Sequence, residues 1–155
     1  GITSSGSGRD ALRVQFGDVN FYRFLVQIGL MPNKTKILKK VDIPNKYFFD
    51  FLRGHFDGDG SSYSYWDPRW KSSYMFYVIF VSASKNHIVW LREIIRMFLN
   101  INGHITKSIN DSTYQLKYAK RESLILLPKL YYDNRVVCLS RKRKKIERMV
   151  RLNNT

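Results

Sequence analysis

The sequence is poor in cysteine, in acidic residues and in long apolar runs. Its one cysteine, Cys138, excludes a disulfide framework and a cysteine-based zinc site, and it fits a reducing compartment. Apolar runs are short, the longest lying around residues 75–81, so no membrane span is predicted. No apolar core follows the opening GITSSGSG, which predicts a flexible leader or a vector-derived remnant at residues 1–8 rather than a signal peptide.

The shortage of acids sets the charge of the chain. Its 155 residues include 27 Lys and Arg but only 12 Asp and Glu, which gives a formal net charge of +15. Such an excess favours a polyanionic partner, with nucleic acid first and an acidic membrane surface second. Aromatic residues make up 15% of the chain, so a disordered basic tail is excluded.

Apolar periodicity predicts a chain that alternates helices with hairpins. Helices are predicted at residues 18–29, from 45 into the stretch at 51–61, and at 84–103, 121–132 and 139–152. Strands are predicted at residues 11–16, 61–65, 74–82, 104–109 and 113–119. From residue 44 onward this order indicates an α+β fold with an antiparallel sheet. Residues 9–43 hold a strand, a helix and a connector without the partners they need, so they look like the end of a preceding unit.

The stretch FLRGHFDGDGS, residues 51–61, crowds three glycines and two aspartates into the end of a predicted helix. Each glycine costs about 1 kcal/mol relative to alanine in a helix interior, so the bare backbone must serve a purpose. The aspartates alternate as calcium ligands do. The twelve-residue calcium loop, however, needs glycine and glutamate where Ser62 and Pro68 stand, so that interpretation fails.

Glycine spacing suggests a different purpose. Gly54 and Gly58 lie four residues apart on one helical face, where a second helix backbone can approach closely. Asp59 then emerges at the tip of the helix pair. Two such tips bring two carboxylates together, which raises their pKa values unless a divalent metal binds between them. A plain helix end in a glycine-rich turn leaves both acids unexplained.

LRGHFDGDG, residues 52–60, resembles the signature of the LAGLIDADG homing endonucleases. The positions that match are Leu52, Gly54, Asp57, Asp59 and Gly60. Arg53 and His55 stand where the signature has Ala and Leu. FLVQIGLMPNKT is similar to the segment that closes one half of such proteins, and YYDNRVVCLSRKRKK resembles the basic element that closes the second half. The resemblance covers roughly residues 10–150.

The resemblance implies an antiparallel saddle-shaped sheet with helices packed on one face. Residues 44–155 would form the LAGLIDADG domain, and residues 9–43 would be the end of a preceding half. A chain with one signature needs a second LAGLIDADG half, either a second copy in a homodimer or a separate N-terminal half. The resemblance fits an intracellular protein of an organelle, a bacterium, an archaeon or a phage.

The function implied is a sequence-specific DNA endonuclease of intron or intein type that hydrolyses both strands of a long site. Mg²⁺ or Mn²⁺ is the implied cofactor, with Ca²⁺ as a non-cleaving substitute. Asp59 is the implied metal ligand. Asp57 is the weaker candidate, because the first acid caps or braces the helix end.

Other catalytic candidates also come from the resemblance. A lysine near the active centre usually assists, and by position this is Lys142, then Lys120. A polar residue just after the second strand is Ser84 or Ser82, although Ser84 is equally suited to cap the following helix.

On this interpretation duplex DNA lies on the concave face of the sheet, with the strands in the major groove. Strand alternation then assigns every second residue to the DNA. The residues assigned in this way are Ser61, Tyr63, Tyr65, Asp67, Arg69, His104, Thr106, Ser108, Thr113, Gln115 and Lys117. The run at 74–82 is apolar on both faces, so its parity stays open. Arg141 and Arg143 are assigned to phosphates, although residues 141–145 can equally be a solvated charge block.

Two other functions remain open. A non-cleaving DNA-binding regulator or an intron RNA maturase would keep the fold without cleavage. The intact Asp59 argues against both, since such derivatives often lose that acid. A general basic RNA-binding module would leave the glycine spacing and the acid pair unexplained.

Overall fold

The computed structural model describes residues 2–4, 12–15, 17–32, 36–70, 73–108 and 112–153. Its strands are β1 (Ile2–Ser4), β2 (Leu12–Val14), β3 (Ser61–Trp66), β4 (Tyr74–Ser82), β5 (His104–Lys107) and β6 (Tyr114–Ala119). Its helices are α1 (Val19–Gln27), the short 3₁₀ helix η1 (Asn45–Tyr47), α2 (Phe48–Asp59), α3 (Lys85–Leu99), α4 (Lys120–Leu130) and α5 (Ser140–Asn153). The predicted order of elements is confirmed, with small shifts at the ends.

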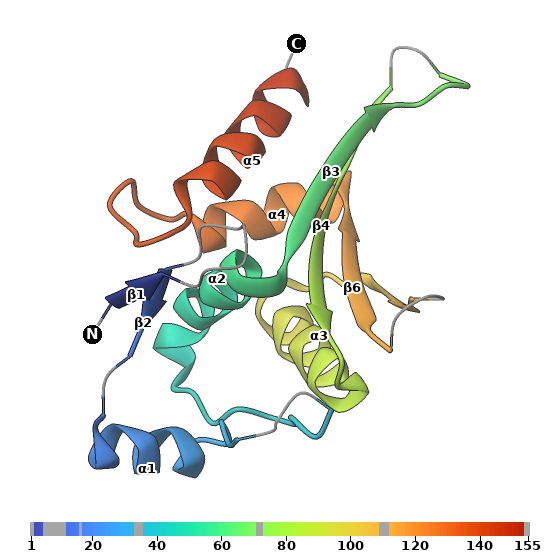
Figure 1. The fold of residues 1–155 in the computed structure, drawn as a ribbon. Helices are drawn as coiled ribbons and strands as arrows, with labels where there is room; N and C mark the ends of the chain where they lie inside the picture. The colour runs from blue at the N-terminus through green and yellow to red at the C-terminus, as the bar shows by residue number, and fades with distance from the viewer. Residues whose placement is uncertain are drawn as a thin grey trace.

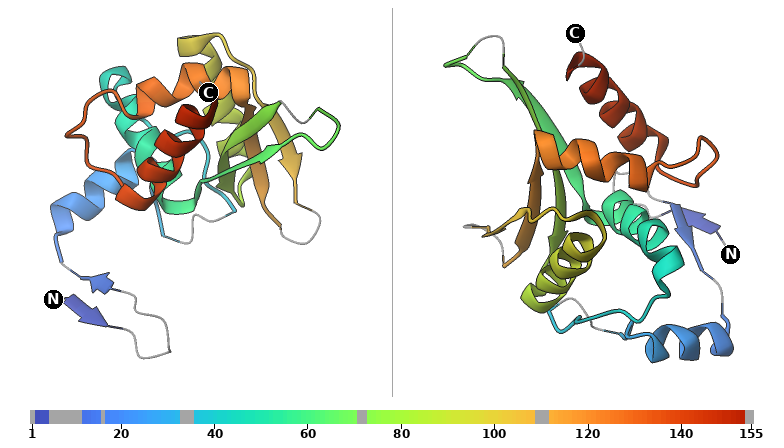
Figure 2. Two further views of the ribbon diagram at one scale, coloured as in Figure 1. Left: turned by 90° about the horizontal axis from the view of Figure 1, so that it is seen from above. Right: turned by 180° about the vertical axis from the view of Figure 1, so that it is seen from behind.

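Four strands form one antiparallel sheet in the order β3-β4-β6-β5 (Figure 1). Helices α2, α3, α4 and α5 all lie on one face of this sheet, as the two further views also show (Figure 2). The predicted α+β class, with an antiparallel sheet and helices on one face, is therefore confirmed. The opposite face is covered by no helix of the described chain, and we call it the open face.

The strand register settles the parity of β4, which the sequence left open. Tyr74, Phe76, Val78 and Phe80 are buried against the helices. The odd-numbered residues of β4 therefore belong to the open face, because side chains alternate along a strand. On that face Tyr77 lies opposite Tyr63 of β3, and Ile79 lies opposite Lys117 of β6.

The core lies between the buried side of β4 and the apolar faces of the helices that cover it. Leu52 and Phe56 of α2 and Leu91 and Ile95 of α3 are fully buried there. Each such side chain contributes about 1.5–3 kcal/mol through removal from water. Burial of these side chains therefore fixes α2, and with it the stretch at residues 51–61, against the sheet.

Caps fix the limits of α3. Ser84 is its N-cap, since the Ser84 hydroxyl accepts a hydrogen bond from the backbone N–H of His87. The helix ends at Leu99, four residues before the predicted Gly103, because Asn100 adopts the left-handed conformation (φ 54°) and stops it.

The N-terminal segment lies on the side of α2 that faces away from the sheet (Figures 1 and 2). β1 pairs with β2, so residues 2–4 of the predicted flexible leader form a strand, while residues 1 and 5–8 lie outside the described part. Asp18 caps α1 as predicted, and Gly29 ends it with φ +100°, where a Cβ would come 2.9 Å from the Lys40 carbonyl oxygen.

The predicted division at residue 44 stays a prediction. The predicted strand at 104–109 ends at Lys107, and Ile109 lies outside the described residues. No helix in the described ranges has the length and apolar character needed to cross a membrane.

Candidate functional site

The C-terminal end of α2 presents an exposed carboxylate. Asp59 is the last residue of the helix, and its side chain forms no hydrogen bond or ion pair with another described residue. The helix ends because Gly60 adopts an extended backbone (φ −72°, ψ 163°), and only glycine fits there, since a Cβ would lie 2.7 Å from the backbone of Phe56. A carboxylate at the negative end of a helix dipole attracts cations. The end of α2 therefore presents the Asp59 carboxylate at a place that favours the binding of a cation.

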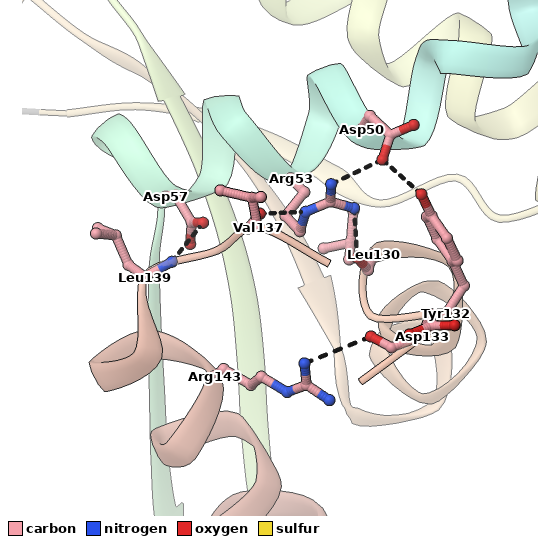
Figure 3. Close-up of polar contacts among 9 residues, drawn as sticks. All are labelled: Asp50, Arg53, Asp57, Leu130, Tyr132, Asp133, Val137, Leu139 and Arg143. Atoms are coloured by element: carbon pink, nitrogen blue, oxygen red, sulfur yellow. Dashed lines mark hydrogen bonds and ion pairs between the residues drawn. The ribbon is translucent and has the colours of Figure 1, made fainter. Parts of the chain in front are cut away.

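Asp57, by contrast, is engaged within the fold (Figure 3). Its Oδ2 accepts a hydrogen bond of 2.8 Å from the backbone N–H of Leu139, just ahead of α5. Its Oδ1 is buried and has no hydrogen-bond partner among the described residues. Asp57 therefore ties the start of α5 to α2.

Lys142 of α5 closes the end of α2. Its Nζ donates hydrogen bonds of 2.6 Å to the carbonyl oxygens of both Phe56 and Gly60, which lack partners in the helix. Burial and the neighbouring Arg141 lower the pKa of Lys142, while Asp57 and Asp59 oppose that shift. The structure thus brings Asp57, Asp59 and Lys142 together.

Two other candidates do not join this group. Lys120 donates a hydrogen bond of 3.0 Å to the Tyr74 carbonyl, at the far end of β4. Asp59 lies at the opposite end of β4, because Ser61, two residues further along, pairs with Ile79. About five residues of β4, or about 17 Å, therefore separate Lys120 from the end of the sheet where Asp59 lies. Ser84 is buried at the start of α3, which it caps, and its hydroxyl donates to the Leu38 carbonyl. Placing Lys120 beside Asp59 was therefore an error, because hairpin order does not reveal which end of the sheet a residue occupies.

A pocket of about 420 Å³ opens between Asp59 and two stacked imidazoles. The rings of His55 and His87 lie 5.3 Å apart at 19°, and Ser82 also lines the pocket. His87 Nδ1 donates to the Lys39 carbonyl at 2.8 Å, so its Nε2, which has no partner in the described chain, is an acceptor. Burial, followed by the neighbouring His87, lowers the pKa of His55 to about 4. Both rings are therefore neutral at pH 7 and do not neutralise Asp59.

A divalent cation fits this site only in part. Within the described ranges, no group of three or more His, Cys, Asp or Glu side chains is arranged to hold a metal ion. Asp59 offers an accessible carboxylate, the ligand that Mg²⁺ prefers, whereas Asp57 is occupied on one oxygen. Within the described residues, Asp59 is therefore the accessible carboxylate at this helix end.

The open face gathers most of the residues that alternation assigned to DNA. The assigned residues that lie in its strands are Ser61, Tyr63, Tyr65, His104, Thr106, Gln115 and Lys117. Ser108 and Thr113 continue this face just beyond β5 and β6, joined by a backbone hydrogen bond. The sequence missed Met75, Tyr77, Ile79 and Val81 on this face, because β4 is apolar on both sides.

Asp67 and Arg69 do not continue the alternation. β3 ends at Trp66, and the Asp67 carboxylate accepts hydrogen bonds from the backbone N–H and guanidinium of Arg69. These bonds lower the pKa of Asp67. The predicted assignment of this pair to the groove face is therefore corrected: both residues build the turn after β3.

Helix α5 divides its basic residues between two roles. Arg143 donates to Glu147, to the Asn134 side chain and to the carbonyls of Asp133 and Asn134, so it holds the loop before α5 rather than standing free (Figure 3). On the exposed side the spacing of three and four residues produces a basic stripe. The stripe consists of Arg141, Lys144, Arg148 and Arg151. It lies opposite the buried Ile146 and Met149.

Comparison with known proteins gives structural similarity alone. No family model matches the chain, and no curated protein sequence matches it. The homing endonuclease I-TnaI is similar with a TM-score of 0.46 and 20% identity, over 74% of this chain and 71% of that one. The homing endonuclease I-CvuI is similar with a TM-score of 0.42 and 22% identity, over 55% of each chain; it is in complex with the I-CreI target, with the DNA not cleaved in 2 mM Mg.

Proposed function

We propose that this chain is one half of a divalent-metal-dependent DNA endonuclease of the LAGLIDADG homing type. The observation that carries the proposal is the exposed carboxylate of Asp59, which has no partner among the described residues and lies on the same helix as the exposed Gly54 and Gly58. A basic protein with net charge +15 gains nothing structural from leaving that acid unpaired. Its availability is explained if it meets a cation and a phosphate.

The second half is inferred from the glycine face of α2. Gly54 and Gly58 are exposed, and a Cβ at either position would meet nothing within 4 Å among the described residues. Packing within the chain therefore gives no reason for two helical glycines that cost about 1 kcal/mol each. Close approach of a second α2-like helix would explain the two glycines, and that helix would bring a second carboxylate close to Asp59.

The residues of the chain would divide the work of phosphodiester hydrolysis. A bound Mg²⁺ or Mn²⁺ would supply an activated water and stabilise negative charge on the phosphate. Asp59 would hold the ion. Lys142 would bind the carbonyl oxygens at the end of α2 and so keep the Asp59 carboxylate in place. The open face would read bases in the major groove, and the basic stripe of α5 would contact phosphates.

Cleavage of a plasmid library with long randomised inserts tests this proposal. If two copies form the nuclease, incubation with MgCl₂ is expected to linearise a small, reproducible subset of plasmids, and EDTA is expected to abolish linearisation. Sequencing of the cut ends measures the result. Two copies bound to one duplex without cleavage in Mg²⁺ or Mn²⁺ would instead favour a regulator, and preferential binding of structured RNA would favour a maturase.

Replacing both Gly54 and Gly58 with alanine is expected to act in opposite directions on stability and on association. The free energy of unfolding should rise by about 0.5–1 kcal/mol per site, since helix propensity improves and nothing in the chain opposes the new methyl groups. Association with the second half should weaken, since the methyl groups separate the two backbones. Chemical denaturation measures the first effect, and light scattering on target DNA measures the second.

The matched control is Gly17→Ala, at a position that also has open space but lies outside α2. Two wild-type copies on one duplex would identify a homodimer, and one copy would identify a separate N-terminal half as the partner. A double variant that associates as tightly as the wild type would remove the glycine face from the interface.

A further inference from the structure

Three tyrosines form a compact cluster on the open face. Tyr63 and Tyr77 are directly paired across β3 and β4, with ring centroids 4.9 Å apart and planes 19° apart. Tyr65 lies 6.3 Å from Tyr63 and 6.4 Å from Tyr77, with interplanar angles of 12° and 10°. The three rings, which we call the tyrosine cluster, are therefore nearly parallel.

Parallel packing decides which part of each ring a ligand can reach. Each ring has the other two beside it at 4.9–6.4 Å, and these neighbours hinder a base from stacking on it. Side chains stand roughly perpendicular to a sheet, which directs ring edges and hydroxyl groups outward. Tyr63 and Tyr65 are each 41% exposed, in agreement with this orientation. The cluster is thus suited to edges in a groove rather than to unstacked bases.

The cluster is also uncharged. Burial, followed by the neighbouring Tyr65, raises the pKa of Tyr63, and the hydrogen bond with Tyr65 raises the pKa of Tyr77. Tyr63 and Tyr77 therefore carry no charge at pH 7. β3 and β4 contain no charged residue, and the neighbours of Tyr77 along this face of β4 are Met75 and Ile79. Asp67, paired with Arg69 just beyond β3, also raises the pKa of Tyr77, so this ion pair borders the cluster, while the strand positions themselves are uncharged.

We infer that the tyrosine cluster reads thymine methyl groups in the major groove of duplex DNA. The thymine C5-methyl is the apolar group that base pairs display there, and an apolar ring edge complements it. The commonest guanine readout uses Arg or Lys, which β3 and β4 lack. The base pairs beneath the cluster are A·T pairs, and Tyr77 is a specificity-determining residue. The inference rests on the proposed DNA-binding function.

Exchange of thymine for deoxyuridine tests the inference, because it removes the methyl group alone. A duplex selected from a randomised library by the wild-type protein is resynthesised with one deoxyuridine at a time, and Kd is measured by fluorescence anisotropy. At two or more adjacent positions the exchange should weaken wild-type binding about three- to fivefold, the effect of one buried methyl group. The Tyr77→Ser variant should show no difference between thymine and deoxyuridine there.

Matched variants separate recognition from folding. Tyr77→Phe keeps the ring edge and should keep the discrimination. Tyr47→Ala removes an exposed tyrosine at the start of α2, away from the sheet, and should also keep it. Wild-type protein that binds its selected duplex equally well with every thymine replaced overturns the inference and leaves the proposed function standing. Failure to select any duplex overturns the proposed function itself.

Discussion

Replacing Asp59 with asparagine is expected to lower the rate of DNA cleavage by about 10³-fold or more, because a metal-ion ligand supplies several kcal/mol of transition-state stabilisation. The amide is nearly the same size but carries no charge to hold a divalent cation. Since the Asp59 side chain makes no hydrogen bond or ion pair with the rest of the described chain, thermal stability should be unchanged. DNA affinity measured in EDTA, where no divalent ion is bound, should not fall.

The measurement is the single-turnover cleavage rate on the selected target, with a melting curve for each protein. Glu93→Gln is the matched control, since it removes the same charge from an exposed position on α3 and should leave cleavage at the wild-type rate. Cleavage that survives Asp59→Asn would remove this residue from the metal site. A fall in melting temperature would show that the carboxylate has a structural role.

Replacing Arg53 with methionine is expected to lower the free energy of unfolding by about 3 kcal/mol, the cost of breaking a buried charged network. Arg53 is only 7% exposed, although it occupies a position where the signature has a small apolar residue. Its guanidinium donates to the carbonyls of Leu130 (3.1 Å) and Val137 (2.9 Å) and to Asp50 (2.7 Å) (Figure 3). Methionine fills the volume but leaves the two carbonyls without their donor.

Urea denaturation at pH 7 measures this loss. Arg135→Met is the control: its ion pair with Asp133 is exposed to solvent, with Arg135 itself 91% exposed, so no measurable change is expected. Equal stability of Arg53→Met and wild type would mean that the loop between α4 and α5 is held by its other contacts. Those contacts include the Tyr132 hydroxyl, which donates to Asp50 at 2.8 Å.

Local patterns predicted much of this fold. Strand alternation placed Tyr63 and Lys117 on one face, and capping rules identified Asp18 and Ser84, because these features depend on neighbours within a few residues. The parity of β4 depends on which helices cover it, and an apolar run carries no such information. The position of Lys120 depends on the direction of β6 in the sheet, which hairpin order does not specify.

Arg53 shows a further limit of sequence reasoning about the candidate site. Its partners Leu130 and Val137 lie 77 and 84 residues away, and both offer backbone carbonyls that every residue possesses. No pattern of residue types marks such acceptors. The stacking of His55 on His87 was missed for the same reason, since the two rings come from different helices and meet only when α2 and α3 pack.

The hydrogen bonds from Lys142 to the end of α2 also impose an order on biosynthesis. A ribosome completes residues 48–60 long before it adds Lys142. The carbonyls of Phe56 and Gly60 therefore lack this hydrogen-bond donor until α5 has been synthesised. A nascent or truncated polypeptide thus carries Asp59 on an unfinished helix terminus. Truncation before residue 142 therefore leaves the turn that carries Asp59 without the cation that holds it in place.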